Sequence, residues 1–312
     1  MQPQTHTTQH VPNVKPEKSM KVWWMLLRPH TLTAAFIPVT IGTVLALMDG
    51  EVSIGLFLAM LVASILVQAA TNMFNEYFDY KRGLDNENSV GIGGAIVRHG
   101  IQASTVLNLA FSFFGIAALL GIYICIASSW WVAAIGLVCM AAGYFYTGGP
   151  APVAYTPFGE LMSGFFMGNV IILLAYFIQI GTVTLDVFVI SVPIAILVGA
   201  IMLANNIRDL DGDKINGRKT LAILIGRINA VRFLAGMFIV SFMLLFLLIG
   251  LGTISFWTLL VLVSIPKAYQ AVKLFQGKTE PIEMMPAMKA TAQTNTQFGF
   301  LLAVGLFISY LL

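Results

Sequence analysis

Long apolar stretches separated by short polar segments dominate this chain. A helix needs about 20 mostly apolar residues to cross a bilayer, and that template fits the sequence roughly nine times. The stretches lie at approximately residues 32–49, 54–75, 104–127, 130–147, 158–181, 185–204, 229–249, 253–271 and 294–312. The pattern therefore predicts an all-α, polytopic membrane protein with about nine transmembrane helices.

The first 20 residues break this pattern because they are polar and contain no early apolar run that ends in a small-residue cleavage site. We therefore expect no cleavable signal peptide. Residues 1–20 are predicted to form a disordered cytoplasmic tail, and residues 21–312 a single transmembrane domain. Pro38, Pro193 and Pro266 fall inside apolar stretches, which makes them candidates for helix kinks.

The composition supports the same class of protein. Of the 312 residues, 58% are hydrophobic and 10% are charged, which excludes an ordinary soluble domain. The two cysteines, Cys125 and Cys139, both fall inside apolar stretches. They are interpreted as small packing residues rather than as redox or metal-binding groups.

The positive charges predict an orientation. In a nine-helix topology, all 17 Lys and Arg lie in four regions: the segment up to the start of the first helix, and the regions after the second, sixth and eighth helices. These four regions are on the same side of the membrane. The opposite face carries Asp49, Glu51 and Asp186. Because positively charged loops remain in the cytoplasm, the N-terminus and the positively charged loops are predicted to be cytoplasmic.

Polar residues concentrate in two of these cytoplasmic segments. Residues 72–85 follow the second predicted helix and contain Asn75 and Asp79, whereas residues 205–213 follow the sixth and contain Asp209 and Asp213. The members of each pair are four residues apart, so in a continuous helix they lie on one face. Carboxylates at that spacing repel each other unless a divalent cation lies between them. Mg²⁺ prefers a few carboxylates together with water and phosphate oxygens.

The two motifs occupy corresponding positions, four helices apart, as in an internal duplication. An acidic cluster at a cytoplasmic helix end is often only a solvated loop. Two Asn/Asp clusters at matching depth, interleaved with Lys and Arg, instead favour a functional site.

Basic residues near these motifs predict a diphosphate site. Arg binds phosphate oxygens through a bidentate fork and Lys as a point charge, although each residue alone is also explained as a cytoplasmic anchor. Breaking an allylic carbon–oxygen bond requires such charges, because Mg²⁺ and cationic side chains stabilise the departing diphosphate. The candidates are Arg28, Lys81, Arg98, Lys214 and Lys219.

Four stretches in this order resemble the UbiA superfamily of intramembrane aromatic prenyltransferases. They are residues 28–32, 75–85, 146–160 and 205–221, and the resemblance spans most of the chain from residue 21 onward. The closer resemblance is to the branch that prenylates 1,4-dihydroxy-2-naphthoate in menaquinone biosynthesis. In that branch Gly83 replaces a third acid of many 4-hydroxybenzoate relatives, and Asp85 follows two residues later. Glu76 departs from the Asp usual in the family, so we expect it to act indirectly.

The resemblance implies a bundle of nine helices around a central cavity, with the acidic helix ends at its cytoplasmic mouth and an apolar tunnel that opens sideways to lipid. It implies catalytic roles for Asp79 and Asp209. Tyr146 would stabilise the allylic cation or orient the acceptor, its alternative role being an interfacial anchor. Contacts to phosphate or to the acceptor carboxylate are expected from Arg28, Arg98 and Lys219. The expected Mg²⁺ ligands are Asn75, Asp79, Asp209 and Asp213, with Asp85 and Asp211 as helpers.

The implied reaction joins a polyprenyl group to 1,4-dihydroxy-2-naphthoate with loss of CO₂ and diphosphate, giving demethylmenaquinol in a bacterial plasma membrane. Prenylation of another aromatic acceptor, such as 4-hydroxybenzoate, stays open as an alternative. A cation-coupled transporter would place its ionisable residues near the bilayer midplane, whereas here they cluster at one face. The CDP-alcohol phosphotransferase family has a single longer acidic motif, whereas this chain has two short acidic motifs that are far apart in the sequence.

Overall fold

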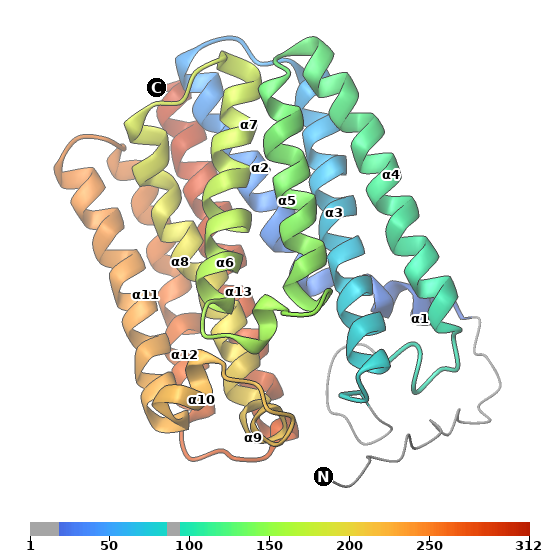
Figure 1. Cartoon of the computed structure of the whole chain (residues 1–312). Coiled ribbons are helices and arrows are strands. Elements are labelled where there is room, and N and C mark those ends of the chain that lie inside the picture. Colours follow the sequence, from blue (N-terminus) through green and yellow to red (C-terminus); the bar gives the residue numbers. More distant parts are fainter. Residues whose placement is uncertain (1–18, 86–93) are drawn as a thin grey trace, which may run out of the picture.

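The computed structural model describes residues 19–85 and 94–312, and within these residues all regular secondary structure is helical (Figure 1). Nine segments in this part of the chain form the bundle. Eight are long and apolar enough to cross a membrane, and the ninth, α5, is a shorter apolar helix. The segments are α2 (Pro29–Asp49), α3 (Ile54–Lys81), α4 (Ala103–Ala127), α5 (Trp131–Thr147), α6–η2–α7 (Gly159–Ile180), α8 (Leu185–Arg208), α11 (Arg227–Gly250), η3–α12 (Phe256–Phe275) and α13 (Pro281–Leu311). The predicted all-α membrane fold is confirmed.

The helices extend beyond the apolar stretches at the end of the bundle that carries the acidic motifs. Helix α3 continues to Lys81 and α8 to Arg208, and α13 begins at Pro281 rather than near residue 294. Hydropathy marks where lipid contact ends, whereas polar residues such as Glu, Gln and Lys continue a helix readily. The longer α3 therefore carries the first acidic motif within a continuous helix.

Four shorter elements lie outside the nine segments. They are α1 (Met20–Leu26), η1 (Val153–Tyr155), α9 (Leu210–Ile215) and α10 (Leu221–Ile225). Each is too short to appear in a search for membrane-spanning stretches. The predicted disordered tail covers residues 1–20, of which residues 1–18 lie outside the described residues.

Several of the spanning segments contain a proline or a stretch of 3₁₀- or π-helix. Pro38 lies inside α2 and Pro193 inside α8, whereas Pro266 lies in the first turn of α12, where the 3₁₀ segment η3 (Phe256–Ser264) passes into α-helix. The segment η2 (Gly164–Val170) is a π-helix between α6 (Gly159–Ser163) and α7 (Ile171–Ile180). Such segments are frequent at functional sites.

Two segments that follow each other in the chain, α5 and η2–α7, pack against different helices. Helix α5 packs mainly on α3 and α4, whereas η2 and α7 pack mainly on α2 and α8. The largest apolar core joins residues of α2, α7, α8, α11, α12 and α13, and a second core joins α1, α3 and α4. A third core, from α2, α3, α4, α5 and α7, connects these two groups of helices. The boundary between the two halves of the bundle runs between α5 and η2–α7, which follow each other along the chain.

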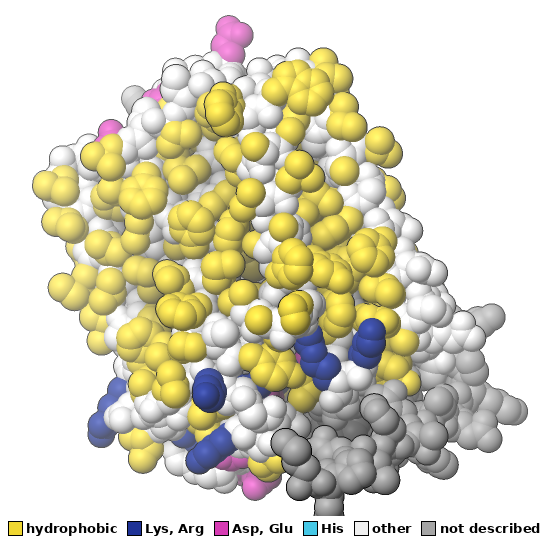
Figure 2. Space-filling model, viewed as in Figure 1, with side chains coloured by type: hydrophobic (Ala, Val, Ile, Leu, Met, Phe, Trp, Pro, Cys, Tyr) yellow, Lys and Arg dark blue, Asp and Glu magenta, His cyan; other side chains and the backbone are white. Residues whose placement is uncertain are grey.

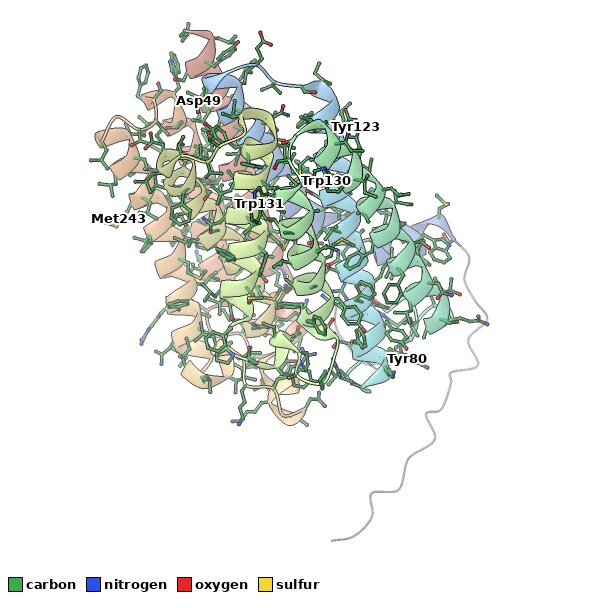
Figure 3. All side chains as sticks on the ribbon, turned by 45° about the horizontal axis from the view of Figure 1, so that its top comes forward. Asp49, Tyr80, Tyr123, Trp130, Trp131 and Met243 are labelled. Carbon is green, nitrogen blue, oxygen red and sulfur yellow. The ribbon has the colours of Figure 1, made fainter. Side chains whose placement is uncertain are left out.

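Charge is unevenly distributed over the molecule. In the face shown in Figure 2, hydrophobic side chains cover the middle, and Lys and Arg gather near the end at which Figure 1 places α9 and α10. Asp49 lies near the opposite end of the bundle from Tyr80, and Tyr123 and Trp130 lie toward the end that carries Asp49 (Figure 3). Aromatic residues of this kind are typical of a membrane–water interface.

Candidate active site

The first acidic motif lies on a continuous helix, as predicted. Asn75 and Asp79 are both within α3, four residues apart, which places them on one face. Thr147, at the end of α5, donates a hydrogen bond from Oγ1 to Asn75 Oδ1 at 2.7 Å. Arg82 donates to the backbone carbonyls of Thr147 and Gly149. These contacts fix the end of α3 against the break that follows α5.

The second acidic motif lies where α8 ends. Asp209 is both the C-cap of α8 and the N-cap of α9, so the expected continuous helix is interrupted there. The Asp213 N–H nevertheless donates to the Asp209 carbonyl at 2.8 Å, which is the bond of a regular helical turn. The spacing of one turn between the two acids is therefore retained across the break.

A single arginine joins the two motifs. Arg218 Nη2 lies 2.8 Å from Asp79 Oδ1, and its Nη1 lies 3.0 Å from Asp213 Oδ1. The guanidinium also lies over the Tyr155 ring, 5.0 Å from its centroid. All three charged side chains are largely buried, with 13% of Arg218, 21% of Asp79 and 10% of Asp213 exposed. The acids that the sequence predicted to cooperate are thus brought together, over a distance of more than 100 residues in the chain.

Arg218 was not among the basic residues selected from the sequence, although it lies in the stretch 205–221 that carries the family resemblance. Its neighbour Lys219 was selected instead, but the Lys219 side chain is exposed and its backbone N–H donates to the Tyr155 carbonyl at 2.9 Å. Arg218 and Lys219 carry the same charge, so counting charges does not distinguish them. The sequence signal that favours Arg218 is its residue type, because a guanidinium can bridge two carboxylates and a lysine ammonium cannot.

Asp213 keeps one oxygen free for a ligand. Its Oδ2 is buried and has no hydrogen-bond partner among the described residues. Burial raises the pKa of Asp213 to about 6, although the neighbouring Arg218 opposes this shift. A buried acceptor without a donor needs an explanation, and a hard divalent cation is one ligand that would satisfy it. This orphaned oxygen, beside Asp79 and Asp209, fits the predicted Mg²⁺ site.

The other acids of the second motif already have arginine partners. Arg208 donates from Nε and Nη2 to the two carboxylate oxygens of Asp209, at 2.7 and 2.5 Å. Arg227 donates from Nη2 to Asp211 Oδ2 at 2.6 Å. Asp211 is 69% exposed, unlike Asp213. Asp211 therefore lies at the surface of the site rather than in it.

Glu76 is buried beside Arg28. Only 1% of its side chain is exposed, its Oε1 accepts from the Ile96 N–H at 3.3 Å, and its Oε2 lies 3.6 Å from Arg28 Nη2. It thus joins α3 to residues 94–101 and to the start of α2. This placement agrees with the indirect role expected for it.

Arg28 has an unusual backbone conformation for a residue with a side chain. Its φ of 51° lies in the left-handed region, which costs energy for any residue other than glycine and often marks a functional position. Its Nε is buried without an acceptor among the described residues, and its side chain lines the central cavity. The predicted role of Arg28 in anion binding is therefore compatible with its placement.

Asp85 lies close to the first motif, because its backbone N–H donates to the Asp79 carbonyl at 3.4 Å. Burial, together with the negative charges of Asp79 and Glu76, raises the pKa of Asp85 to about 6, and Arg28 and Arg98 oppose this shift. Arg98 is exposed and packs against Gly94. Both residues are thus within electrostatic range of the site.

The three lysines predicted to bind the diphosphate lie at the surface, away from the ion pairs of the acidic motifs. Lys81 and Lys214 are exposed, and the Lys81 ammonium lies 5.8 Å from the centre of the Tyr77 ring. Within the described residues, no ion pair joins Lys81, Lys214 or Lys219 to the acidic motifs. A role in binding the diphosphate stays a prediction for these three lysines.

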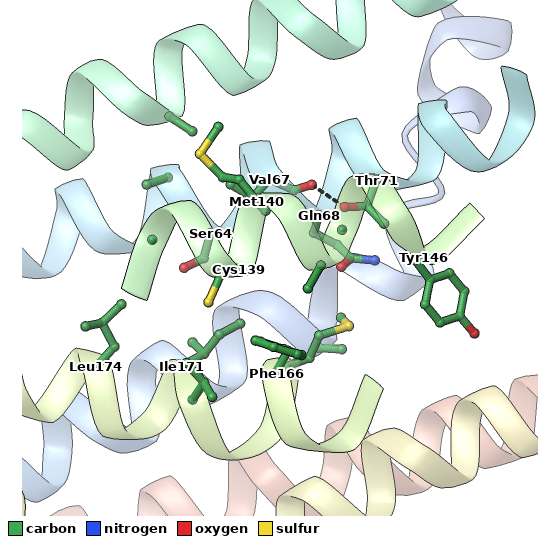
Figure 4. Close-up of a pocket in the computed structure, with 18 of the residues that line it drawn as sticks. Ser64, Val67, Gln68, Thr71, Cys139, Met140, Tyr146, Phe166, Ile171 and Leu174 are labelled. Atoms are coloured by element: carbon green, nitrogen blue, oxygen red, sulfur yellow. Dashed lines mark hydrogen bonds between the residues drawn. The ribbon is translucent and has the colours of Figure 1, made fainter. Parts of the chain in front are cut away.

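A cavity of about 440 Å³ extends from the motifs into the bundle (Figure 4). Its mouth is polar and its walls come from α2, α3, α4, α5, α6–η2–α7 and α8. Farther in, the lining is mainly apolar, and Cys125 and Cys139 are part of it. Both cysteines are free thiols. The polar residues at the mouth are Arg28, Asn72, Asn75, Tyr146 and Asn205.

Tyr146 lies at the mouth, on α5. Figure 4 shows its side chain at one end of the cavity and Leu174 toward the other. The Tyr146 hydroxyl approaches Gly159 so closely that a Cβ at Gly159 would lie 3.1 Å from it. Tyr146 therefore reaches from α5 to the start of α6, across the boundary between the two halves of the bundle. Its position is compatible with the predicted contact to the reacting groups.

The described acids do not form a complete metal site by themselves. Among the residues that the structure describes, no group of three or more His, Cys, Asp or Glu side chains could hold a metal ion by itself. Mg²⁺ usually binds through one or two carboxylates plus substrate phosphates. A metal ion at the motifs would therefore need ligands beyond these side chains.

The chain is similar to several known proteins. The model of the UbiA prenyltransferase family matches residues 35–285. A 1,4-dihydroxy-2-naphthoate octaprenyltransferase from Bacillus subtilis is 57% identical over 94% of each chain. An enzyme of that name from Mycobacterium tuberculosis is 31% identical, with 88% of this chain and 92% of the relative covered.

Solved structures share the fold. A UbiA homolog from Aeropyrum pernix has a TM-score of 0.67 and 13% identity, and the match covers 90% of this chain and 98% of the homolog. A UbiA homolog from Archaeoglobus fulgidus bound to DMAPP and Mg²⁺ has a TM-score of 0.59 and 15% identity, with 91% and 99% covered.

Proposed function

The chain belongs to the UbiA prenyltransferase family, and from this premise we propose that it transfers a polyprenyl group from polyprenyl diphosphate to 1,4-dihydroxy-2-naphthoate. The products are demethylmenaquinol, CO₂ and diphosphate. The observation that supports the proposal most is the pair of acidic motifs, bridged by Arg218, at the polar mouth of an apolar cavity. The B. subtilis relative, at 57% identity, supports naphthoate as the acceptor.

The acidic motifs would hold Mg²⁺ and, together with it, the diphosphate of the donor. When bound, the ion supplies positive charge that neutralises the departing diphosphate. Asp79 and Asp213 face each other across Arg218, and each has one carboxylate oxygen engaged by that residue. The second oxygens, together with Asn75 and Asp209, form the proposed ligand set. Asp85 is a nearby helper.

Arginines complete the neutralisation of the diphosphate. Arg218 is fixed between the motifs, and Arg28 lines the cavity with an unpartnered Nε. A planar guanidinium binds phosphate or carboxylate oxygens in pairs. Arg28 accordingly contacts either the diphosphate or the carboxylate of the acceptor. Arg98, Lys81, Lys214 and Lys219 add positive potential around the entrance.

Bond breaking begins at the allylic carbon. Its bond to the diphosphate oxygen breaks heterolytically, and the electron pair leaves with the diphosphate. The Tyr146 ring, at the cavity mouth, stabilises the positive charge that develops on the prenyl carbon. The apolar lining beyond Tyr146 excludes water, which would otherwise capture the cation.

Ring attack then forms the new carbon–carbon bond. The naphthoate carbon that bears the carboxylate attacks the allylic carbon and becomes tetrahedral. The bond to the carboxylate breaks next, its electron pair returns to the ring, and CO₂ leaves. Because decarboxylation restores the aromatic ring, no base is needed at that carbon. In 4-hydroxybenzoate the attacked carbon carries hydrogen, so a proton leaves and the carboxylate stays.

This difference gives the decisive test. Purified protein, Mg²⁺, a polyprenyl diphosphate and carboxyl-labelled 1,4-dihydroxy-2-naphthoate should release labelled CO₂ in step with quinol formation. Label retained in the prenylated product, or consumption of 4-hydroxybenzoate alone, would reject the naphthoate assignment. Absence of any prenylated product from either acceptor would reject prenyl transfer itself.

The chain is a multi-pass membrane protein, and we place its N-terminus and acidic mouth on the cytoplasmic side of a bacterial plasma membrane. The gathering of Lys and Arg at one end of the bundle supports this orientation (Figure 2). In a variant without Cys125 and Cys139, cysteines introduced near Lys81 and Asp213 should react only from the cytoplasmic side. A cysteine near Glu51 should react only from outside. Labelling of all three from one side would contradict the orientation.

A further inference from the structure

The deep part of the cavity is bordered by glycines whose missing side chains leave open space. Gly121 of α4 and Gly136 of α5 both line the cavity. A Cβ built on either one would meet no atom of the described chain within 4 Å. Neither backbone has a positive φ. Thus neither helix packing nor backbone conformation requires glycine at these two positions.

A third glycine of the same wall shows the contrast. Gly143 of α5 also lines the cavity, but a Cβ there would lie 2.6 Å from Thr71 Oγ1. Its small size is therefore explained by the close approach of α3. Glycine inside a helix costs about 1 kcal/mol relative to alanine. At Gly121 and Gly136, the one feature among the described residues that accounts for this cost is the open space in the cavity.

The two glycines lie at a similar depth. Helices α4 and α5 are consecutive and joined by a short turn after Ala127. Gly121 is six residues before Ala127 and Gly136 five residues after Trp131, so at 1.5 Å per residue both lie about 8 to 9 Å from the same end of the hairpin. The ten residues from Tyr146 to Gly136 correspond to about 15 Å along α5.

The distance from Tyr146 to Gly136 can be compared with the length of an isoprenoid chain. An extended isoprene unit adds four chain atoms, which span about 5 Å at ordinary bond lengths. About three units therefore separate the reacting end, at Tyr146, from Gly136. Beyond this point the cavity reaches the lipid-facing surface, because its lining residues Trp130 and Leu137 are each 66% exposed.

We propose that Gly121 and Gly136 keep open the passage by which the prenyl chain, from about its third isoprene unit onward, leaves the cavity for the bilayer. The two glycines thereby allow the protein to use donors longer than about three isoprene units. This inference rests on the proposed function and adds to it the residues that allow long donors. The alternative exit is the boundary between α5 and η2–α7, nearer the mouth.

The test compares donors of two, three, four, five and eight isoprene units in wild type, Gly136→Leu and Gly121→Leu. A leucine at either position enters open space, so we expect the fold to persist, with Tm within a few degrees of wild type. The value of kcat/KM for the eight-unit donor should fall at least 30-fold. For the two-unit donor it should change less than threefold. If wild type does not transfer the two-unit donor, its inhibition constant against a longer donor replaces kcat/KM and should likewise stay within threefold.

Two further variants make the result specific. Gly115→Leu is the matched control, because Gly115 is also on α4 and also has no atom within 4 Å, but it is exposed and does not line the cavity. It should leave the whole donor series unchanged. Gly136→Ala adds one methyl group and improves helix propensity, so it should raise Tm while lowering the eight-unit rate by less than threefold.

The outcomes separate the two proposals. Equal loss for short and long donors in folded Gly136→Leu and Gly121→Leu, or no loss for the eight-unit donor, would overturn the exit route beside the glycines and leave the proposed function intact. Failure of wild type to transfer any donor would reject the proposed function instead.

Discussion

The two acidic motifs have the same spacing, but their negative charges are offset in different ways. In the first, an amide replaces one acid, and the partners of Asn75 and Asp79 come from distant parts of the chain, Thr147 and Arg218. In the second, Asp209, Asp211 and Asp213 are each paired with an arginine within 16 residues. The first motif thus depends on tertiary structure for its charge balance, whereas the second is surrounded by arginines close to it in sequence.

This difference in charge balance indicates which substitutions should affect the site most. Among the described residues, Arg218 is the one that forms ion pairs with both motifs. At the surface of the second motif, Asp211 forms one ion pair within the described part of the chain, with Arg227. We therefore expect the functional cost of a substitution to decrease from the acids that carry the site, to Arg218, and finally to Asp211.

The largest effect is expected from the acids that would hold the diphosphate. Asp79→Asn and Asp209→Asn each remove a carboxylate charge without changing side-chain volume, and prenyl transfer should fall by a factor on the order of 10³ or more. EDTA should abolish wild-type turnover. Product formation from a radiolabelled donor measures the loss, and an unchanged elution profile and Tm in detergent control for folding. Full activity of either variant at limiting Mg²⁺ would contradict the metal site.

The sequence could predict these acids because their signal is local. Hydropathy located the nine segments, since lipid contact requires about 20 apolar residues whatever the packing. The spacing of Asn75 and Asp79, and of Asp209 and Asp213, identified two matched clusters. Both signals depend on residues within a few turns of each other. The helix break at Asp209 was missed because a one-turn spacing is the same in one helix and in two helices joined by a cap.

Tertiary contacts account for what the sequence could not predict. Arg218 and Lys219 are adjacent cations, and only the fold shows that Arg218 reaches Asp79, 139 positions earlier. The cavity walls were also inaccessible, because a glycine that borders empty space and one that contacts Thr71 look the same in the sequence. The start of α13 was placed too late because its first turns are polar, although they continue the helix.

Arg218 should show the next largest effect, with opposite signs in two measurements. Arg218→Gln removes the cation between Asp79 and Asp213, so kcat should fall roughly 10- to 100-fold through weaker stabilisation of the departing diphosphate. Binding of Mn²⁺ in the absence of donor should tighten roughly tenfold, because a positive charge about 3 Å from the ligands no longer opposes the metal. Electron paramagnetic resonance of free Mn²⁺ measures the affinity.

Arg218→Lys provides the matched comparison, since it keeps the charge but cannot bridge two carboxylates with a fork. It should lower kcat with little change in Mn²⁺ affinity. Weaker Mn²⁺ binding in Arg218→Gln would show that Arg218 only positions the acids and does not compete with the metal.

Metal binding should weaken as the pH decreases. Burial raises the pKa of Asp213 and of Asp85 to about 6, so each carboxylate is mostly charged at pH 7 and mostly protonated at pH 5. A divalent cation requires the charged form. Between pH 7 and pH 5 the Mn²⁺ affinity of donor-free protein should therefore fall roughly tenfold for each of the two acids.

Asp213→Asn tests the assignment. Asparagine does not titrate, so this variant should bind Mn²⁺ more weakly at pH 7 and lose less affinity as the pH decreases to 5. A slope identical to that of wild type would assign the pH dependence to other groups.

The smallest effect is expected at Asp211, although it lies between two acids of the motif. Its side chain is 69% exposed and its partner Arg227 also donates to the Ile207 carbonyl. Exposed ion pairs contribute about 0 to 1 kcal/mol, and Arg227 keeps its backbone contact when the pair is lost. Asp211→Asn should therefore change kcat/KM less than about twofold and Tm by only a few degrees. Titration of Mg²⁺ at saturating donor is the sharper measurement, because a ligand would shift the half-saturating concentration even where the maximal rate recovers. A shift comparable to that of Asp209→Asn would mean that the second motif binds through three acids, and its exposed edge would then belong to the site.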